Sequence, residues 1–219
     1  MKNAWTVVGL VAVVLVGGSI IYSNSVSKNY DEGVDVTKEY IKGNPDANIT
    51  LVEFSDFECP ACASWFPVVS DIMDKYGDQV RFEYKHFPLP IHPSAEIAAR
   101  AAEAAGQQDK FYEFHDLLFE NQNSWKNSLN PTGDFEEYAE ELSLNVELFE
   151  QHMKSSLIKD KVRSELNEGR SLGINATPTF VINGEVVSGI SFDQLASTIE
   201  DLVNPEVEFS LPNGTETGG

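Results

Sequence analysis

The feature that most constrains this chain is a pair of cysteines placed where a strand gives way to a helix. Cys59 and Cys62 are the only cysteines in 219 residues, in the stretch FECPAC. Residues 49–54 (ITLVEF) precede them as a short apolar run, typical of a buried strand. After them, apolar side chains recur at helical spacing from residue 59 to residue 76, with Pro67 inside the run. The pattern predicts a strand, a short turn and a helix, kinked by its proline.

The remaining chain adds a second strand, a long helical stretch and a hairpin. Residues 80–87 (VRFEYKHF) alternate in polarity and predict a strand, and about eighty residues of helical character follow, at about 92–172. The pair Asn183-Gly184 favours a type I′ turn, which predicts a hairpin over residues 179–188. A last helix is expected over residues 192–203. Because strand–helix–strand implies a parallel pair with a right-handed crossover, we expect an α/β fold whose small sheet is interrupted by a helical insertion.

The N-terminal segment has a different composition from the rest. Residues 4–22 contain no charged side chain. A helix of that length nearly spans a hydrocarbon core of about 30 Å, whereas a cleaved signal has a shorter apolar region of about 7–15 residues. We therefore expect a membrane anchor within residues 1–22, with a cleaved signal as the alternative. With Lys2 on the inner side, both interpretations place the remaining chain outside the cytoplasm.

The polar ends and the net charge set further limits. Residues 23–38 have no periodicity and predict a flexible tether, and residues 204–219 predict a flexible tail. The folded domain is then expected over residues 39–203. The formal net charge is −20, from 35 acidic and 15 basic side chains. Such a surface repels phosphate backbones, so nucleic-acid binding is not expected.

Three interpretations compete for the cysteine pair. A disulfide that closes so short a loop removes little entropy from the unfolded chain, so it would be a poor structural staple. Structural zinc needs four ligands, but the chain has no second cysteine pair, and its four histidines include a single pair at His-x₃₋₅-His spacing, His86 and His92. We therefore favour a pair that opens and closes by dithiol–disulfide exchange, and expect no metal and no cofactor. An extracytoplasmic location permits the disulfide.

The position of each cysteine assigns it a different chemistry. Cys59 would stand at the N-terminus of the helix, where unpaired N–H groups and the helix dipole favour a thiolate, and Pro60 suits the first helical position. Cys62 would lie one turn on, on the same helix face. Glu53 interrupts the apolar strand, and its burial would raise its pKa. Such a carboxyl could exchange a proton with Cys62, directly or through a water molecule.

Two segments together carry a family resemblance. The stretches VEFSDFECPAC and TPTFVINGEVVSG, separated by a helical block of about eighty residues, resemble the DsbA-like branch of the thioredoxin fold, in its membrane-anchored bacterial form. The resemblance covers about residues 40–203. It implies that Cys59 attacks and Cys62 resolves, with Glu53 as the buried acid. It also implies that Pro178 is cis beside the disulfide, and that the backbone of Thr177 hydrogen-bonds an extended substrate.

The residues around the cysteines are expected to tune the site. The strongest oxidases of this family carry a histidine between the cysteines, whereas this chain has Pro60-Ala61. We therefore expect a reduction potential between about −270 mV, as in thioredoxin, and about −120 mV, as in DsbA. Glu58 would oppose the Cys59 thiolate if it stays charged. The candidate substrate-binding residues are Thr177, Pro60, Ala61 and Trp65.

The sequence thus predicts an extracytoplasmic thiol:disulfide oxidoreductase that most readily promotes disulfide formation. Its partners would be substrate proteins with free thiols or disulfides, and a membrane redox protein of the DsbB-like or vitamin K epoxide reductase-like kind. Two alternatives remain open: a reductase or isomerase of the same fold, and a non-catalytic binding or chaperone module with a structural disulfide. His86 and His92 are expected in surface or capping positions.

Overall fold

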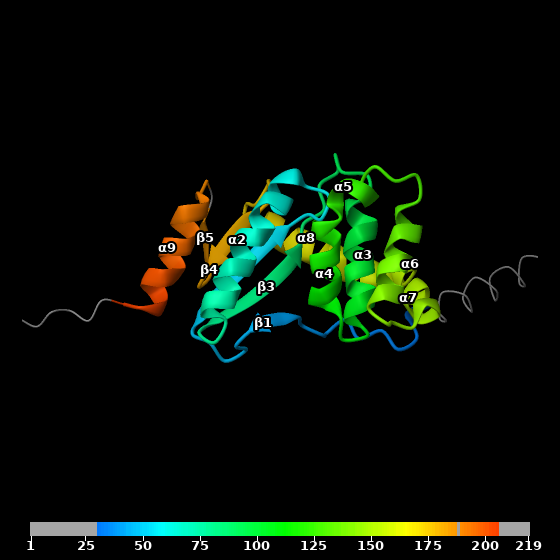
Figure 1. Cartoon of the computed structure of the whole chain (residues 1–219), viewed down its shortest axis with the longest axis horizontal. Helices are drawn as coiled ribbons and strands as arrows, with labels where there is room; N and C mark the ends of the chain where they lie inside the picture. The colour runs from blue at the N-terminus through cyan, green and yellow to red at the C-terminus, as the bar shows by residue number, and fades with distance from the viewer. Residues whose placement is uncertain (1–29, 188, 206–219) are drawn as a thin grey trace, which may run out of the picture.

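The computed structural model describes residues 30–187 and 189–205. These residues form one mixed sheet and the helices around it (Figure 1). The strands are β1 (Ile41–Gly43), β2 (Ile49–Ser55), β3 (Val80–His86), β4 (Thr179–Ile182) and β5 (Glu185–Val187). The helices are α2 (Pro60–Tyr76), α3 (Ala95–Gly106), α4 (Phe111–Glu120), α5 (Gln122–Trp125), α6 (Pro131–Glu141), α7 (Val146–Met153), α8 (Ser156–Ser171) and α9 (Phe192–Val203).

The sheet has the order β1-β3-β2-β4-β5. β2 and β3 are parallel and are connected through α2, as the strand–helix–strand pattern predicts. β4 pairs antiparallel with β2, and β5 closes the predicted hairpin. No sequence pattern predicted β1, which pairs antiparallel with β3 at one edge. β1 ends at Gly43, whose φ of +87° and close approach to the Val80 carbonyl leave no room for a side chain.

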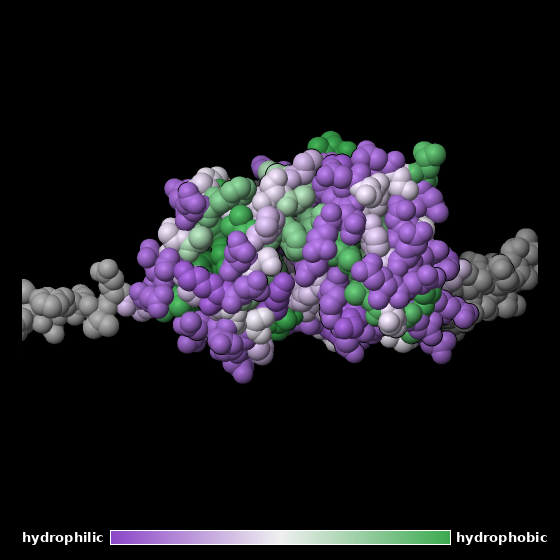
Figure 2. Space-filling view, in the orientation of Figure 1, coloured by the Kyte–Doolittle hydropathy of each residue, from purple (hydrophilic) through white to green (hydrophobic). Residues whose placement is uncertain are grey.

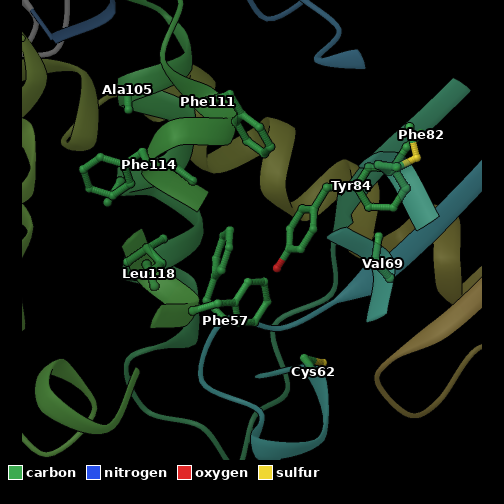
Figure 3. Packing of buried hydrophobic residues seen from close by; sticks show 14 of the residues in the cluster. Phe57, Cys62, Val69, Phe82, Tyr84, Ala105, Phe111, Phe114 and Leu118 are labelled. Atoms are coloured by element: carbon green, nitrogen blue, oxygen red, sulfur yellow. The ribbon is translucent and has the colours of Figure 1, made fainter. Parts of the chain in front are cut away.

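The helical segment between β3 and β4 lies beyond one edge of the sheet. Figure 1 shows α3–α7 gathered there, with α9 at the opposite end. α8 returns to the sheet and packs against β3, and α9 packs against α2. Buried aromatic side chains join the sheet to the helices, among them Phe57, Tyr84 and Phe111 (Figure 3). The predicted thioredoxin fold with a helical insertion is confirmed.

Alternation along β3 corrects the expectation for His86. Val80, Phe82, Tyr84 and His86 all point to the buried face, and His86 is only 1% exposed. The side chain was expected in a surface or capping position. Because successive strand residues point to opposite faces, the same alternation that predicts the strand places His86 inside.

The N-terminal boundary of the ordered chain also differs from the expectation. Residues 30–38, assigned to a flexible tether, contact the helical insertion. The Asp31 carboxylate accepts hydrogen bonds from the hydroxyls of Ser155 (2.6 Å) and Ser156 (2.8 Å) at the start of α8, and the backbone N–H of Asp35 donates to the Gln107 side chain (2.7 Å). Side-chain hydrogen bonds between residues 72 to 125 positions apart have no local sequence signature, so the packing of residues 30–38 on the insertion could not be predicted.

The predicted anchor lies in residues 1–22, outside the described residues, and so does the tail from residue 206 onward. Of the helices in residues 30–187 and 189–205, none combines the length and the apolar character needed to cross a membrane.

Candidate active site

The two thiols occupy the N-terminal turn of α2. Cys59 is the N-cap residue with an extended backbone (φ −70°, ψ 123°), and Pro60 takes the first helical position. Both cysteines are free thiols; Cys59 is 6% exposed and Cys62 is fully buried. Pro60 and Ala61 between them face solvent. The sulfur that can be reached from outside therefore belongs to Cys59, and the second sulfur lies behind it.

The two thiols have opposite acidities. The pKa of Cys59 is lowered to about 5 by the Cys62 thiol, by Thr177 and by the N–H groups of Ala61 and Cys62. Burial raises the pKa of Cys62 well above its usual value, and its hydrogen bond to Cys59 and the charge of Glu53 act in the same direction. At neutral pH Cys59 is thus a thiolate and Cys62 a thiol.

Glu53 lies beneath the pair on β2. Its side chain is 2% exposed, and burial raises its pKa to about 7, against the hydrogen bond that Ser55 Oγ donates to its Oε1 (2.6 Å). A cavity of about 10 Å³ borders Glu53 on the side of Lys42 and His115. That volume is near the minimum for one water molecule. The carboxyl can therefore change its protonation state near neutral pH, as predicted from its position in the strand.

The loop before β4 approaches the thiols from the other side. The Thr177–Pro178 peptide bond is cis, as the resemblance implied. The backbone carbonyl of Thr177 lies 3.6 Å from the Cys59 sulfur, although the two residues are 118 positions apart. Thr177 and Pro178 are both half-buried. The structure thus brings together the four residues that the sequence put forward as catalytic.

Trp65 lies one turn beyond Cys62, in an aromatic stack. Its ring packs on Phe180 (centroids 4.9 Å apart) and edge-on against Phe192 (4.4 Å). Phe192 is 44% exposed and opens a groove between α2 and α9, of about 280 Å³, whose apolar lining includes Val68 and Ile72. Figure 2 shows apolar residues in the hollow between these helices, bordered by hydrophilic ones.

Sequence reasoning did not predict the roles of three side chains that hold the loop before Cys59. Asp56 is buried and accepts hydrogen bonds from the N–H groups of Glu58 and Leu89 and from His92 Nδ1. Gln122 of α5 donates to the carbonyls of Phe57 (2.7 Å) and Cys59 (2.9 Å). Most of these partners are far apart in the sequence, so no local motif predicts their hydrogen bonds.

Glu58 is the third of these side chains, and it does not face the thiolate as an unpaired charge. Its Oε2 accepts a hydrogen bond from the backbone N–H of Ser94 (2.6 Å), the N-cap residue of α3. A helix N-terminus favours a nearby negative charge. The Glu58 carboxylate, although next to Cys59 in sequence, is therefore bound to the start of the helical insertion.

A second buried polar cluster lies where β3 meets α3 and α8. Glu103 contacts His86 Nε2 (3.2 Å) and Lys161 Nζ (2.9 Å), and Glu165 accepts from the His86 backbone N–H (2.7 Å). Burial alone would raise the pKa of Glu103, but His86 and Lys161 outweigh it, and the pKa is lowered. Donor atoms of His86, Glu103 and Glu165 lie within 4.8 Å of one another, a spacing that could suit a metal ion. The Lys161 ammonium already supplies a cation there.

The comparison with known families agrees with this geometry. The family model described as thioredoxin matches residues 35–201, which includes the CxxC helix, the insertion and the Thr177–Pro178 loop. The chain belongs to the thioredoxin family.

Two solved structures of this fold resemble the chain. A thioredoxin-like oxidoreductase from Silicibacter pomeroyi is 29% identical, with a TM-score of 0.64, over 76% of this chain and 94% of that one. DsbA2 from Pseudomonas aeruginosa is 28% identical, with a TM-score of 0.62, over 77% of this chain and 96% of that one. The fold thus places this member of the thioredoxin family beside DsbA-like oxidoreductases.

One relative of this thioredoxin-family chain is named as an antiporter. The Na(+)/H(+) antiporter NhaA 3 of Salinispora tropica is 36% identical over 152 residues, which is 69% of this chain. The chain spans only 22% of the length of that antiporter. The similarity therefore concerns one segment of a much longer protein.

Proposed function

We propose that this chain is an extracytoplasmic thiol:disulfide oxidoreductase that promotes disulfide formation in other proteins. The observation that carries the proposal is the division of acidity between its two thiols. Cys59 has a pKa of about 5 and reaches the surface, whereas the pKa of buried Cys62 is raised well above its usual value. Cys59 is therefore a good leaving group, and Cys62 attacks only after it loses its proton. This division suits thiol–disulfide exchange and would give a purely structural disulfide no advantage.

The reaction starts from the Cys59–Cys62 disulfide. A substrate thiolate attacks the Cys59 sulfur, the Cys59–Cys62 bond breaks, and Cys62 leaves as a thiolate that takes up a proton. A second thiolate of the substrate then attacks the substrate sulfur of the mixed disulfide and expels the Cys59 thiolate. Two electrons pass from the substrate to the cysteine pair. A membrane redox partner of the DsbB-like or vitamin K epoxide reductase-like kind would accept them and restore the disulfide.

The surroundings of Cys59 suit a protein substrate. Pro60 and Ala61 are exposed beside the sulfur, and the backbone of Thr177 stands on its other side. An extended substrate segment would hydrogen-bond to Thr177 and continue over Trp65 toward the groove between α2 and α9. The location outside the cytoplasm, and the attachment to a membrane, rest on the apolar segment of residues 4–22.

The reduction potential tests the direction of the reaction. A Cys59 pKa of about 5 lies between the values of about 3.5 for DsbA and about 7 for thioredoxin. We therefore expect a potential between about −270 and −120 mV, measured by equilibration against glutathione and dithiothreitol. The oxidised protein should also oxidise a reduced, unfolded test protein. A potential below the thioredoxin value would reverse the direction and favour a reductase.

A trapping experiment tests the exchange mechanism itself. In Cys62→Ala, the mixed disulfide on Cys59 should persist, because the resolving thiol is missing. Non-reducing gels should then show substrate bound to Cys62→Ala and none bound to Cys59→Ala. If neither variant accumulates mixed disulfides, thiol exchange with proteins is wrong.

A further inference from the structure

The hydroxyl of Ser55 is a polar group buried between two titratable side chains of the site. Residues two apart on a strand point to the same face, so Glu53 and Ser55 of β2 share one face. Ser55 is only 1% exposed. A serine in the buried interior of a strand contributes little packing and must satisfy its hydroxyl. Its partners are therefore informative.

Ser55 contacts both ends of a proton transfer. Its Oγ donates a hydrogen bond to Glu53 Oε1 at 2.6 Å. The Ser55 hydroxyl also interacts with the Cys62 side chain, and this interaction lowers the pKa of Cys62, against the burial that raises it. A hydroxyl carries one donor and two acceptor positions. While Ser55 donates to Glu53 it can accept from the Cys62 thiol, and after a rotation it can donate to the thiolate.

A water molecule in the adjoining cavity does not offer the same path. That cavity is lined by Glu53 together with Lys42, Ser70 and His115, and neither Cys62 nor Ser55 borders it. Tyr84 of β3 also approaches the buried site, and its hydroxyl points toward the part of the core that holds Phe57 and Cys62 (Figure 3). The Tyr84 hydroxyl also interacts with Ser55, although within the described residues it has no hydrogen-bond partner of standard geometry. Ser55 is thus the side chain placed between the thiol and the carboxyl.

We propose that Ser55 relays the proton between Cys62 and Glu53, which deepens the exchange mechanism proposed above and rests on it. When a substrate thiolate opens the disulfide, the Cys62 thiolate takes the Ser55 proton and Ser55 takes the proton of Glu53. When Cys62 attacks a mixed disulfide on Cys59, the order is reversed: the thiol proton passes to Ser55 and the Ser55 proton passes to Glu53. No proton is gained or lost within the three groups, and Glu53 later exchanges its proton with solvent.

A two-phase thiol reaction isolates this step. The reduced protein reacts with 5,5′-dithiobis(2-nitrobenzoate): Cys59 attacks first and releases one thionitrobenzoate, and Cys62 then attacks the Cys59 sulfur and releases the second. In Ser55→Ala the second phase should slow at least tenfold at pH 6, while the first phase is unchanged; a positioned proton acceptor contributes about 10²–10⁴-fold. Ser55→Thr, which keeps a hydroxyl, should retain the wild-type rate within about threefold. Ser64→Ala, on the exposed side of α2, is the matched control.

The pH profile separates a relay from a structural defect. The wild-type second phase should follow the titration of Glu53 near pH 7, whereas that of Ser55→Ala should rise about tenfold per pH unit as hydroxide removes the proton directly. The groups facing the pair from other elements are Cys59, Tyr84, Lys42 and His115, and all are unchanged in the variant. A loss in Ser55→Ala that is equal at all pH values, or shared by the first phase, would overturn the relay.

A double variant covers the case in which Ser55→Ala perturbs folding. If Ser55 acts through Glu53, adding Ser55→Ala to Glu53→Gln should change the second phase by less than about twofold; a further tenfold loss would contradict the relay. The reaction uses a small reagent and no protein substrate. A wild-type protein with both phases that fails to oxidise a test protein would therefore refute the proposed function and leave the relay standing.

Discussion

Two carboxyl groups of this protein are buried to the same degree and held in opposite states. Glu53 is 2% exposed and Glu103 is 1% exposed. The pKa of Glu53 is raised to about 7, because burial is opposed only by the Ser55 hydroxyl. The pKa of Glu103 is lowered, because Lys161 and His86 contact the carboxylate and outweigh burial. Depth alone therefore does not determine the charge of a buried acid; the presence of a cation beside it does.

The difference distinguishes a reactive part of the molecule, around Cys59, Cys62 and Glu53, from a structural part, the cluster around Glu103 and Lys161. Among the described residues no cation pairs with Glu53, so its carboxyl can take up or give off a proton beside Cys62. Glu103 stays ionised and joins α3 to α8 through Lys161, whose ammonium also donates to the Lys38 carbonyl and lies over the Tyr40 ring. Buried ion pairs of this kind are costly to break from one side.

The largest expected effect comes from removing the cation of the second cluster. Lys161→Met leaves the buried Glu103 without its lysine partner and with only His86 and the Tyr40 hydroxyl in contact, so we expect a loss of about 3–5 kcal/mol in the free energy of unfolding, measured in urea. The thiol reactions of the folded protein should not change. Lys159→Met, an exposed neighbour on α8, is the control. Adding Glu103→Gln should recover much of the loss; a loss below about 1 kcal/mol in Lys161→Met would contradict the comparison.

A smaller effect should appear in the pH dependence of stability. The unfolded chain loses the Glu53 proton near pH 4.5 and the folded chain near pH 7. Between these values the folded state binds more protons, so stability falls as pH rises, by up to about 3 kcal/mol. Glu53→Gln should remove this fall. Urea unfolding of the oxidised wild type and Glu53→Gln at pH 4.5 and pH 8 measures it, since the cysteines do not titrate in the disulfide. An equal change in the free energy of unfolding between the two pH values in both proteins would be evidence against a neutral Glu53.

The smallest effect is expected where the ion pair is near the surface. Lys85 pairs with Glu168 at 3.5 Å, and the Glu168 side chain is half exposed. Lys85→Met should cost less than about 1 kcal/mol, because solvent screens such pairs. The same urea titrations measure it. If Lys85→Met cost as much free energy of unfolding as Lys161→Met, the loss of a lysine charge, and not the burial of its partner carboxylate, would explain the effect of Lys161→Met.

The reactive part could be predicted from the sequence because its residues stand next to structural signals. Cys59 and Cys62 follow a recognisable strand, Glu53 interrupts it, and Pro178 precedes another strand. The structure brings these four residues together. Ser55 was overlooked, although the period of two along β2 places it beside Glu53.

The structural part, the cluster around Glu103 and Lys161, could not be predicted in the same way. His86, Glu103, Lys161 and Glu165 come from three elements and are between 4 and 79 positions apart. Charged residues in helices usually face solvent, and only the packed structure shows that these do not. His86 alone carried a usable signal, in the alternation of β3.

The hydrogen bonds from the helical insertion to the loop before Cys59 have a consequence for engineering. Gln122, Leu89 and the start of α3 supply donors to carbonyl and carboxylate groups of residues 56–59. Excising the insertion to obtain a minimal thioredoxin would leave these acceptors without partners, in the turn that presents the attacking sulfur. The insertion is therefore not a detachable module. A shortened version would need new donors at these positions before its cysteines could be compared with those of the full chain.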